Sequence, residues 1–187
     1  MFKKETYIAR REQLRKDVKN GLIIIQGNGE SSCNYKDNTY FFRQDSTFLY
    51  FFGLQREDMY GVLDCETGED WIFANDYDIE DIIWTGALPT VKELAATVGV
   101  TKSGSLADLQ NTVNKAVAQG RKVHCLPPYR TDNMMKLGNL LGIKIDSVNR
   151  YASLELIKAC VKQRSIKTDE EIAEIERAIA TAYNMHV

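Results

Sequence analysis

The pattern of apolar and polar positions predicts that helices and strands alternate along the chain. Residues 4–20 carry apolar or long side chains at helical spacing, and Asn20-Gly21 ends this predicted helix. The residues that fall on one face of this helix are Tyr7, Arg11, Leu14 and Val18. The β-branched run "LIIIQ" at 22–26 follows directly and predicts a buried strand. The chain therefore begins as a helix that leads into a strand of the core.

The next apolar segments predict a hairpin and more helices. "MYGVLDC" and "WIFAN" flank "ETGED", where Gly68 permits positive φ, and together they predict two antiparallel strands. "PTVKELAATVG" predicts a helix with Pro89 in its first turn. "SLADLQNTVNKAVAQG" predicts another, with Ser105 as its N-cap and Gly120 just past its end.

The second half of the chain continues the alternation. "KVHCLP" and "IKIDSV" predict two short strands, and the helical segment "RTDNMMKLGNLLG" separates them. Strands that alternate with helices are typical of an α/β fold. We therefore predict a mixed β-sheet with helices on both faces.

Residues 38–54, "NTYFFRQDSTFLYFFGL", combine seven aromatic residues with a polar tetrad, Arg43 to Ser46. If Asp45 or Ser46 caps a short helix that Gly53 ends, Phe48, Phe51 and Phe52 share one face. These aromatic side chains are then expected in the core. Arg43 precedes the cap among aromatic residues, so we expect its charge to be partly desolvated and to need acceptors.

Composition and charge exclude several classes of protein. The chain has 187 residues, of which 44% are hydrophobic, and a net charge of −2, a balance typical of a globular domain. No run of Lys or Arg exceeds a pair, so neither nucleic acid nor an anionic membrane is expected as a partner. No apolar run could span a bilayer or serve as a signal sequence, so we expect a cytoplasmic location. The scattered residues Cys33, Cys65, Cys125 and Cys160 are expected to be reduced.

No cluster of residues predicts an active site by itself. Gly27 and Gly29 in "QGNGES" follow a strand as in a phosphate cradle, but the third glycine and a following helix are missing, which favours a plain turn. The acids of "DYDIEDIIW" lack the glycine and glutamate of a calcium loop and instead suit the first turn of a helix. His124 and His186 are too far apart for a zinc helix, and no GxSxG motif occurs. We therefore predict no catalytic residue and no metal ligand in this chain.

Two strings of residues resemble a known family. One runs Tyr40-x-x-Arg43-Gln44-x-Ser46-x-Phe48-x-Tyr50-x-x-Gly53, with Ile83-Trp84-x-Gly86 about thirty residues later. The other combines Arg164-x-x-Lys167 with Glu170-Glu171-Ile172. Both resemble the creatinase-like N-terminal domain of Xaa-Pro aminopeptidases and prolidases and the segment that joins it to the catalytic domain. Phe52 departs from the threonine that the family often has there.

The resemblance implies a domain organisation and a cofactor. Residues 1–160 would form the creatinase-like domain, which has a ribonuclease H-like motif. Residues 161–187 would form the linker and the first helix of a pita-bread catalytic domain. In the family that domain binds two divalent metal ions, commonly manganese, through two Asp, one His and two Glu. This chain holds none of those ligands, so alone it is expected to be inactive and to bind no cofactor.

The resemblance also implies roles for residues and partners. Trp84 matches a tryptophan near the substrate entrance of a neighbouring subunit, although a tryptophan in "IIW" could also simply pack. Arg43, Gln44, Arg164 and Lys167 match residues expected to support the structure and the interface between domains. The implied partners are the chain's own catalytic domain, further copies in a homo-oligomer and short proline-containing peptides. One alternative is a non-catalytic peptide- or protein-binding domain of a pseudo-peptidase. Another is a nucleotide-binding module in which the segment "QGNGES" would bind the nucleotide.

The last residues predict one more helix. Thr168 and Glu171 form a T-x-x-E capping box. The apolar stripe that follows consists of Ile172, Ile175, Ile179 and Tyr183. A lone helix with such a stripe is marginal in water, so we expect residues 168–187 to dock onto their own domain or another copy.

Overall fold

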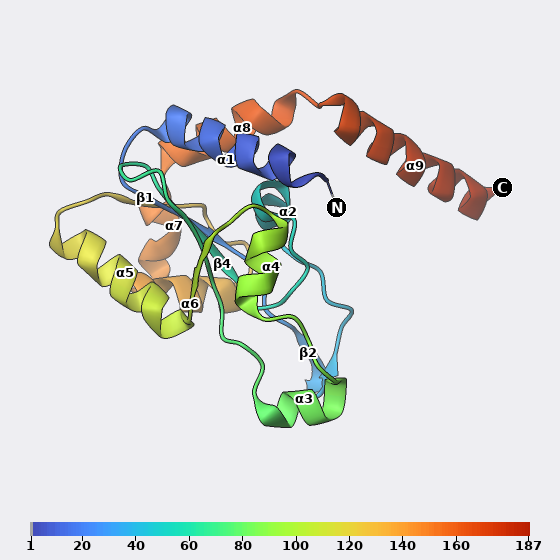
Figure 1. Cartoon of the computed structure of the whole chain (residues 1–187), viewed down its shortest axis with the longest axis horizontal. Helices are drawn as coiled ribbons and strands as arrows, with labels where there is room; N and C mark the ends of the chain where they lie inside the picture. The colour runs from blue at the N-terminus through green and yellow to red at the C-terminus, as the bar shows by residue number, and fades with distance from the viewer. Residues whose placement is uncertain (1) are drawn as a thin grey trace.

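A computed structural model describes residues 2–187 and shows helices around a central sheet (Figure 1). The helices are α1 (Lys4–Val18), α2 (Ser46–Phe52), α3 (Ile79–Thr85), α4 (Val91–Thr97), α5 (Leu106–Ala118), α6 (Thr131–Leu141), the 3₁₀ helix η1 (Ile145–Ser147), α7 (Val148–Tyr151), α8 (Leu154–Ser165) and α9 (Asp169–His186). The strands are β1 (Leu22–Gln26), β2 (Ser32–Tyr35), β3 (Asn38–Thr39), β4 (Tyr60–Asp64), β5 (Asp70–Phe73), β6 (Lys102–Gly104) and β7 (Val123–Cys125). None of these described helices combines the length and apolar composition needed to cross a bilayer.

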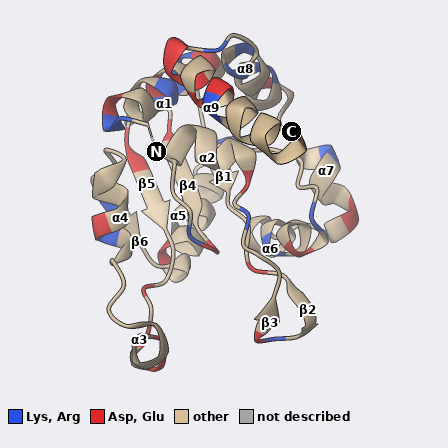
Figure 2. Cartoon of the chain, turned by 90° about the vertical axis from the view of Figure 1, so that its right-hand side faces the viewer, with Lys and Arg blue, Asp and Glu red and all other residues tan. Residues whose placement is uncertain are grey.

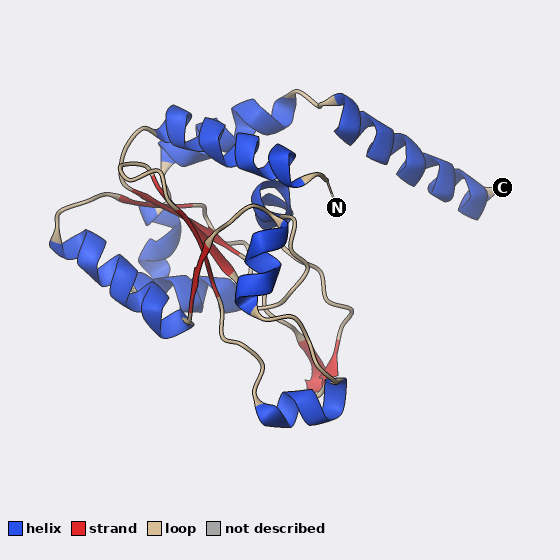
Figure 3. Cartoon of the chain, in the orientation of Figure 1, coloured by secondary structure: helices blue, strands red, loops and turns tan. Residues whose placement is uncertain are grey.

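The central sheet is mixed, as the sequence predicts. Its strand order is β6-β5-β4-β1-β7, and β2 and β3 form a separate hairpin. The pairs β1/β4 and β4/β5 are antiparallel, whereas β1/β7 and β5/β6 are parallel. Figure 3 shows helices on both sides of this sheet. The predicted α/β fold is confirmed.

The strand β1 supplies the centre of two hydrophobic cores because its side chains alternate between the faces of the sheet. Ile23 and Ile25 lie in the core that α1, α2, α4 and α8 cover. Leu22 and Ile24 lie in the core that α5, α6 and α7 cover. Each fully buried side chain of this size contributes about 1.5–3 kcal/mol of transfer free energy. Burial on both faces explains why the strand is a continuous apolar run.

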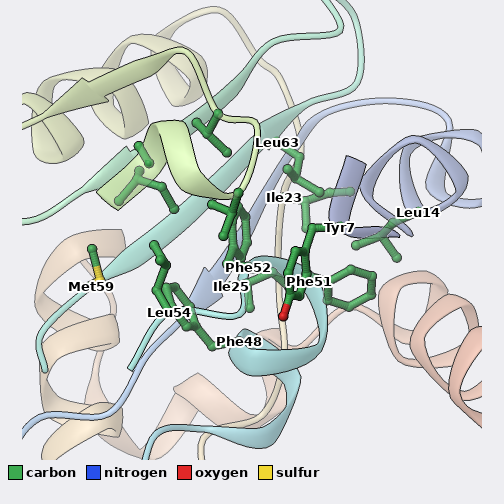
Figure 4. Close-up of a cluster of buried hydrophobic side chains, with 14 of the residues drawn as sticks. Tyr7, Leu14, Ile23, Ile25, Phe48, Phe51, Phe52, Leu54, Met59 and Leu63 are labelled. Carbon is green, nitrogen blue, oxygen red and sulfur yellow. The ribbon is translucent and has the colours of Figure 1, made fainter. Parts of the chain in front are cut away.

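The helix α2 packs its aromatic residues into the first core, as Figure 4 shows. Asp45 caps it, because Oδ1 accepts from Thr47 N at 2.8 Å and from Phe48 N at 2.9 Å. Gly53 ends it in the left-handed region, with φ of 65°. Phe48, Phe51 and Phe52 are each fully buried. The predicted cap, stop and buried face are therefore confirmed.

Arg11 on α1 is a fully buried charge that ties three segments together. Its Nε donates to Asp70 Oδ2 at 2.8 Å, Nη1 to Phe51 O at 3.0 Å and Nη2 to Val98 O at 2.9 Å. Burial lowers the pKa of the guanidinium, and the Asp70 carboxylate opposes that shift. The predicted face of α1 is thus buried, with an arginine at its centre.

Two predictions about local structure are wrong. Residues 143–148 do not form a strand: Ile145–Ser147 is a 3₁₀ helix, with Val148 fully buried and Ile145 exposed. The edge of the sheet beside β5 is instead occupied by β6, which the sequence analysis missed. Pro89 lies one residue before Thr90, the N-cap of α4, and therefore outside the first turn. The Thr90 side chain accepts from Glu93 N, and this capping box sets the helix start.

Candidate functional site

Trp84 lies on an arm that projects from the body of the domain. The helix α3 has no buried residue, and Figure 1 shows it at the end of two connecting segments, away from the sheet. Asp78 and Asp81 cap it reciprocally, at 2.9 and 3.1 Å, so the acidic first turn serves as a helix start as predicted. The Trp84 side chain is 88% exposed. It does not pack against its own chain, which leaves it free to contact another molecule.

The base of this arm is anchored to the body. The Arg56 guanidinium lies 4.0 Å from the centre of the Tyr77 ring, and Tyr77 Oη donates to Glu57 Oε1 at 2.6 Å. On the returning side, Val91 N donates to Asp76 Oδ1 at 2.6 Å. These contacts hold both connecting segments where they leave the body. The arm therefore presents Trp84 from a fixed base.

The β2/β3 hairpin is a second projection at the same end of the domain, and Figure 2 shows it set apart from α3. Its exposed aromatic residues are Tyr35, Tyr40 and Phe41. Arg130 holds its base by donating to Gly29 O at 3.0 Å and to Ser31 Oγ at 2.5 Å. We did not predict this hairpin from the sequence, although the polar turn Lys36-Asp37 between Tyr35 and Tyr40 is a signal for it.

The tetrad Arg43 to Ser46 divides into an exposed cation and a buried amide. The Arg43 side chain is exposed, so the expectation that it is desolvated among aromatic residues is wrong. Its neighbour Phe41 is fully exposed and provides no apolar cover. Gln44 is the buried member: Oε1 accepts from Asn28 N at 2.7 Å and from Asp45 N at 2.9 Å. Its Nε2 donates to Arg56 O at 2.6 Å.

Arg164 and Lys167 lie where α8 leads into α9. Arg164 Nη1 donates to Thr47 Oγ1 at 3.0 Å, which joins α8 to α2. Lys167 follows the end of α8, and its Nζ donates to the carbonyl of Arg164 in the last turn of that helix. Both contacts lie within this chain. An additional role toward a catalytic domain stays a prediction.

Among residues 2–187, the hydrogen bond and the ion pair that join α9 to the body both come from its first turn. Thr6 Oγ1 donates to Glu170 Oε2 at 2.9 Å, and Arg10 pairs with Glu171. The capping box of Thr168 and Glu171 is present as predicted. Figure 1 shows the rest of α9 running away from the domain, and its apolar stripe from Ile172 to Tyr183 is exposed. The stripe does not dock onto its own domain, and docking onto another copy stays a prediction.

The loop of Gly27 and Gly29 is a turn between strands. Gly27 N donates to Met59 O at 2.8 Å, and the strand β2 follows where a phosphate-binding loop would lead into a helix. A Cβ on Gly27 would lie 2.8 Å from Met59 O and 2.9 Å from Gln44 Oε1, so glycine is needed for close packing. The geometry thus favours the plain turn over the nucleotide cradle.

His124 is buried and has hydrogen-bond partners for both ring nitrogens. Nε2 lies 3.1 Å from Asn20 O, and Nδ1 lies 2.6 Å from Ser153 Oγ. Because a carbonyl can only accept, the proton is on Nε2. Burial lowers the pKa of this imidazole. His124 therefore connects β1, β7 and α8 structurally.

The described residues provide neither a metal cluster nor a disulfide. Within residues 2–187, no group of three or more His, Cys, Asp or Glu side chains could hold a metal ion. The residues present thus do not fit a metal pair, and we assign no metal chemistry to them. The four cysteines are free, as predicted.

Comparison with known proteins identifies the family. The model of the aminopeptidase P N-terminal domain matches residues 7–124, which is more than half of the chain. The chain belongs to the aminopeptidase P N-terminal domain family. The matched residues include the Arg43 to Ser46 tetrad and the α3 arm.

Several relatives and solved structures are similar to this aminopeptidase P N-terminal domain. It is 28% identical to rat Xaa-Pro dipeptidase over 169 residues, which cover 86% of the chain and 33% of that protein. It is 24% identical to a probable Xaa-Pro aminopeptidase of Metarhizium acridum, over 86% of the chain and 31% of that protein. A variant of Escherichia coli aminopeptidase P has the same fold, with a TM-score of 0.75 and 20% identity over 95% of this chain and 42% of that one. The chain therefore spans about a third of the length of these relatives.

Proposed function

We propose that this domain is the non-catalytic N-terminal part of a cytoplasmic Xaa-Pro aminopeptidase or dipeptidase, and that it shapes access to the active site. The observation that carries the proposal is Trp84, which is 88% exposed on an arm with an anchored base. Large exposed aromatic residues are typical of contact surfaces. The exposed isoleucines beside it, Ile79 and Ile83, extend the same surface. In a homo-oligomer this arm would border the substrate entrance of a neighbouring subunit and restrict it to short peptides.

We propose that hydrolysis takes place in a downstream catalytic domain with two divalent metal ions, manganese being the expected metal. Such a pair would supply Lewis-acid activation of the water and of the peptide carbonyl in that domain. Residues 1–160 would form the N-terminal domain, and residues 161–187 the linker and the first catalytic helix. The exposed stripe on α9 supports this division, because such a surface needs an apolar partner. Arg43 would then face the catalytic domain, and Arg164 and Lys167 would hold the linker.

Trp84→Ala in the full-length parent tests the entrance. We expect kcat/KM for proline-containing tripeptides to change about tenfold, with the melting temperature unchanged because Trp84 is not packed in its own chain. Val117→Ala, an exposed apolar change on α5 outside the arm, controls for loss of apolar surface. Unchanged kinetics in an enzyme that sizing shows to be oligomeric would contradict the proposed entrance.

A non-catalytic binding domain of a pseudo-peptidase is the second candidate, because the hairpin residues Tyr35, Tyr40 and Phe41 also form an exposed aromatic surface. Metal-dependent cleavage of an Xaa-Pro peptide by the full-length parent separates the two functions. The isolated chain is expected to show no such cleavage and no tight Mn²⁺ binding by calorimetry. Turnover that stays with the 187-residue chain through successive columns would contradict both candidates.

A further inference from the structure

Arg56 is a buried cation at the base of the α3 arm. Its side chain is 9% exposed, and Nε and Nη1 are buried atoms with no hydrogen-bond partner among residues 2–187. None of the ion pairs among these residues involves Arg56. A buried charge is costly unless other groups compensate it. The groups that Arg56 does contact must therefore stabilise its guanidinium.

The groups that compensate this charge belong to the connecting segment that leads into α3. Arg56 Nη2 donates to the Asn75 carbonyl, and the guanidinium lies 4.0 Å from the centre of the Tyr77 ring. The negative face of an aromatic ring attracts a cation, most strongly where water is excluded. The contacts that stabilise the buried cation are therefore the same contacts that fix residues 75–77.

The main chain of Arg56 is itself held by Gln44. Gln44 Nε2 donates to Arg56 O at 2.6 Å, and Gln44 Oε1 accepts from Asn28 N at 2.7 Å and from Asp45 N at 2.9 Å. The Gln44 side chain is buried, so these bonds are shielded from water. A chain of contacts thus runs from the tetrad that contains Gln44, through Arg56, to the arm that carries Trp84.

The position of α3 depends on residues 75–77 because the helix does not pack against the body. It has no buried residue, and Figure 3 shows it joined to the body by two loops. The returning loop is held by the same segment, since Asp76 Oδ1 accepts from Val91 N at 2.6 Å. Both loops of the arm therefore depend on the segment that Arg56 holds.

We propose that Arg56 is the positioning residue of the α3 arm: it fixes residues 75–77 through the Tyr77 ring and the Asn75 carbonyl, and so determines where Trp84 lies. An apolar side chain of similar volume would fill the same space without an unpaired buried charge, so packing alone does not account for an arginine here. The effect of Arg56 on substrate entry rests on the proposed function, whereas its hold on the arm does not.

Backbone order parameters from ¹⁵N NMR relaxation of the 187-residue chain test the hold on the arm. For the amides of α3 we expect about 0.85, the value of rigid backbone, and less than about 0.6 in Arg56→Met. The midpoint of urea unfolding should stay unchanged, because methionine replaces a guanidinium that has two unpaired nitrogens. Arg56→Lys keeps a cation at the Tyr77 ring and should restore most of the order of α3.

Two further variants locate the effect. Tyr77→Leu removes the ring at a half-buried position, so it should loosen α3 as much as Arg56→Met and gives the measurement if Arg56→Met does not fold. Arg130→Met is the matched control: Arg130 holds the base of the other projection, so its loss should loosen β2 and β3 and leave α3 ordered. Three results would overturn the proposal: an α3 below about 0.6 in the original chain, an α3 that stays rigid in both Arg56→Met and Tyr77→Leu, or equal loosening of α3 by Arg130→Met.

Kinetics of the full-length parent test the consequence for Trp84. Arg56→Met should change kcat/KM for proline-containing tripeptides in the same direction as Trp84→Ala, mainly through KM, because the arm would border the entrance and not the reacting atoms. The double variant should differ little from Trp84→Ala alone, since Arg56 acts through the arm. Fully additive effects would show that Arg56 does not act through Trp84. If Trp84→Ala alone changes nothing, the proposed entrance is wrong, and the order parameters decide whether Arg56 holds the arm.

Discussion

Arg10 and Glu171 form an ion pair, with 3.4 Å between Nη2 and Oε1, that joins α1 to the first turn of α9. Arg10 is buried, its guanidinium lies 3.9 Å from the centre of the Tyr50 ring, and Nη1 donates to Tyr50 O at 2.9 Å. Nη2 has no hydrogen-bond partner among the described residues, so Glu171 is its compensating charge. Together with the hydrogen bond from Thr6 to Glu170, this pair attaches the start of α9 to α1.

Glu171→Gln should loosen the start of α9 without breaking its capping box, because glutamine also serves at that position. Arg10 would lose its counter-charge, and we expect amide hydrogen exchange at Ile172 and its neighbours to accelerate about tenfold, or about 1.4 kcal/mol. Glu174→Gln, in an exposed pair with Arg177, is the matched control and should have almost no effect. Equal exchange in both variants would mean that the buried pair does not hold α9.

Gln44→Ala should destabilise the domain by about 2–4 kcal/mol, whereas Arg43→Ala should stay within about 0.5 kcal/mol. The first change leaves Asn28 N and Arg56 O without their buried partner, and the second removes an exposed side chain. Urea unfolding of the two variants measures the free energy of unfolding that each substitution removes. A larger effect at Arg43 would restore the sequence-based expectation that the arginine is the buried member.

Gly61→Ala should destabilise the domain by about 3 kcal/mol or more, because a Cβ there would overlap the Phe52 ring. Gly68→Ala is the control: its Cβ would meet no atom, and only the φ of 75° is unfavourable, at about 1 kcal/mol. The melting temperature of the Gly61→Ala variant should therefore be well below that of the Gly68→Ala variant. The reverse order would show that α2 can shift away from β4.

Stability should fall as the pH is lowered from 7 to 5 because of His124. Burial lowers its pKa in the folded state, so below about pH 6.5 the unfolded chain binds a proton that the folded chain does not. The stability is thus present above the unfolded pKa and is lost as the pH falls toward the folded pKa, by at most about 1.4 kcal/mol per pH unit. Urea unfolding at several pH values measures this slope, and His124→Gln should flatten it. If the His124→Gln variant lost stability with falling pH as steeply as the original chain, groups other than His124 would cause the pH dependence.

Features that depend on residues close together in the chain could be predicted from the sequence. Asp45 and Gly53 bound α2 because a side-chain cap and a left-handed residue act within one turn of the helix. The alternation of helices with strands sufficed for the α/β fold, and β1 was recognisable because burial on both faces requires an apolar run. The family strings around Trp84 and Arg164 likewise depend only on the order of residues.

Other features were decided by contacts between distant segments. Nothing local distinguishes Arg43 from Gln44, since adjacent residues of an extended segment point in opposite directions and the fold chooses which one faces Asn28 and Arg56. The strand β6 forms by pairing with the distant strand β5, and Ile145–Ser147 forms a 3₁₀ helix followed by Val148, which is buried in the second core. A cavity at the carboxyl ends of β1 and β7 is lined by residues of these strands and of α2, α6 and α8, so it exists only when all five elements come together. Such contacts depend on tertiary packing, which overrides the weak preferences of short segments.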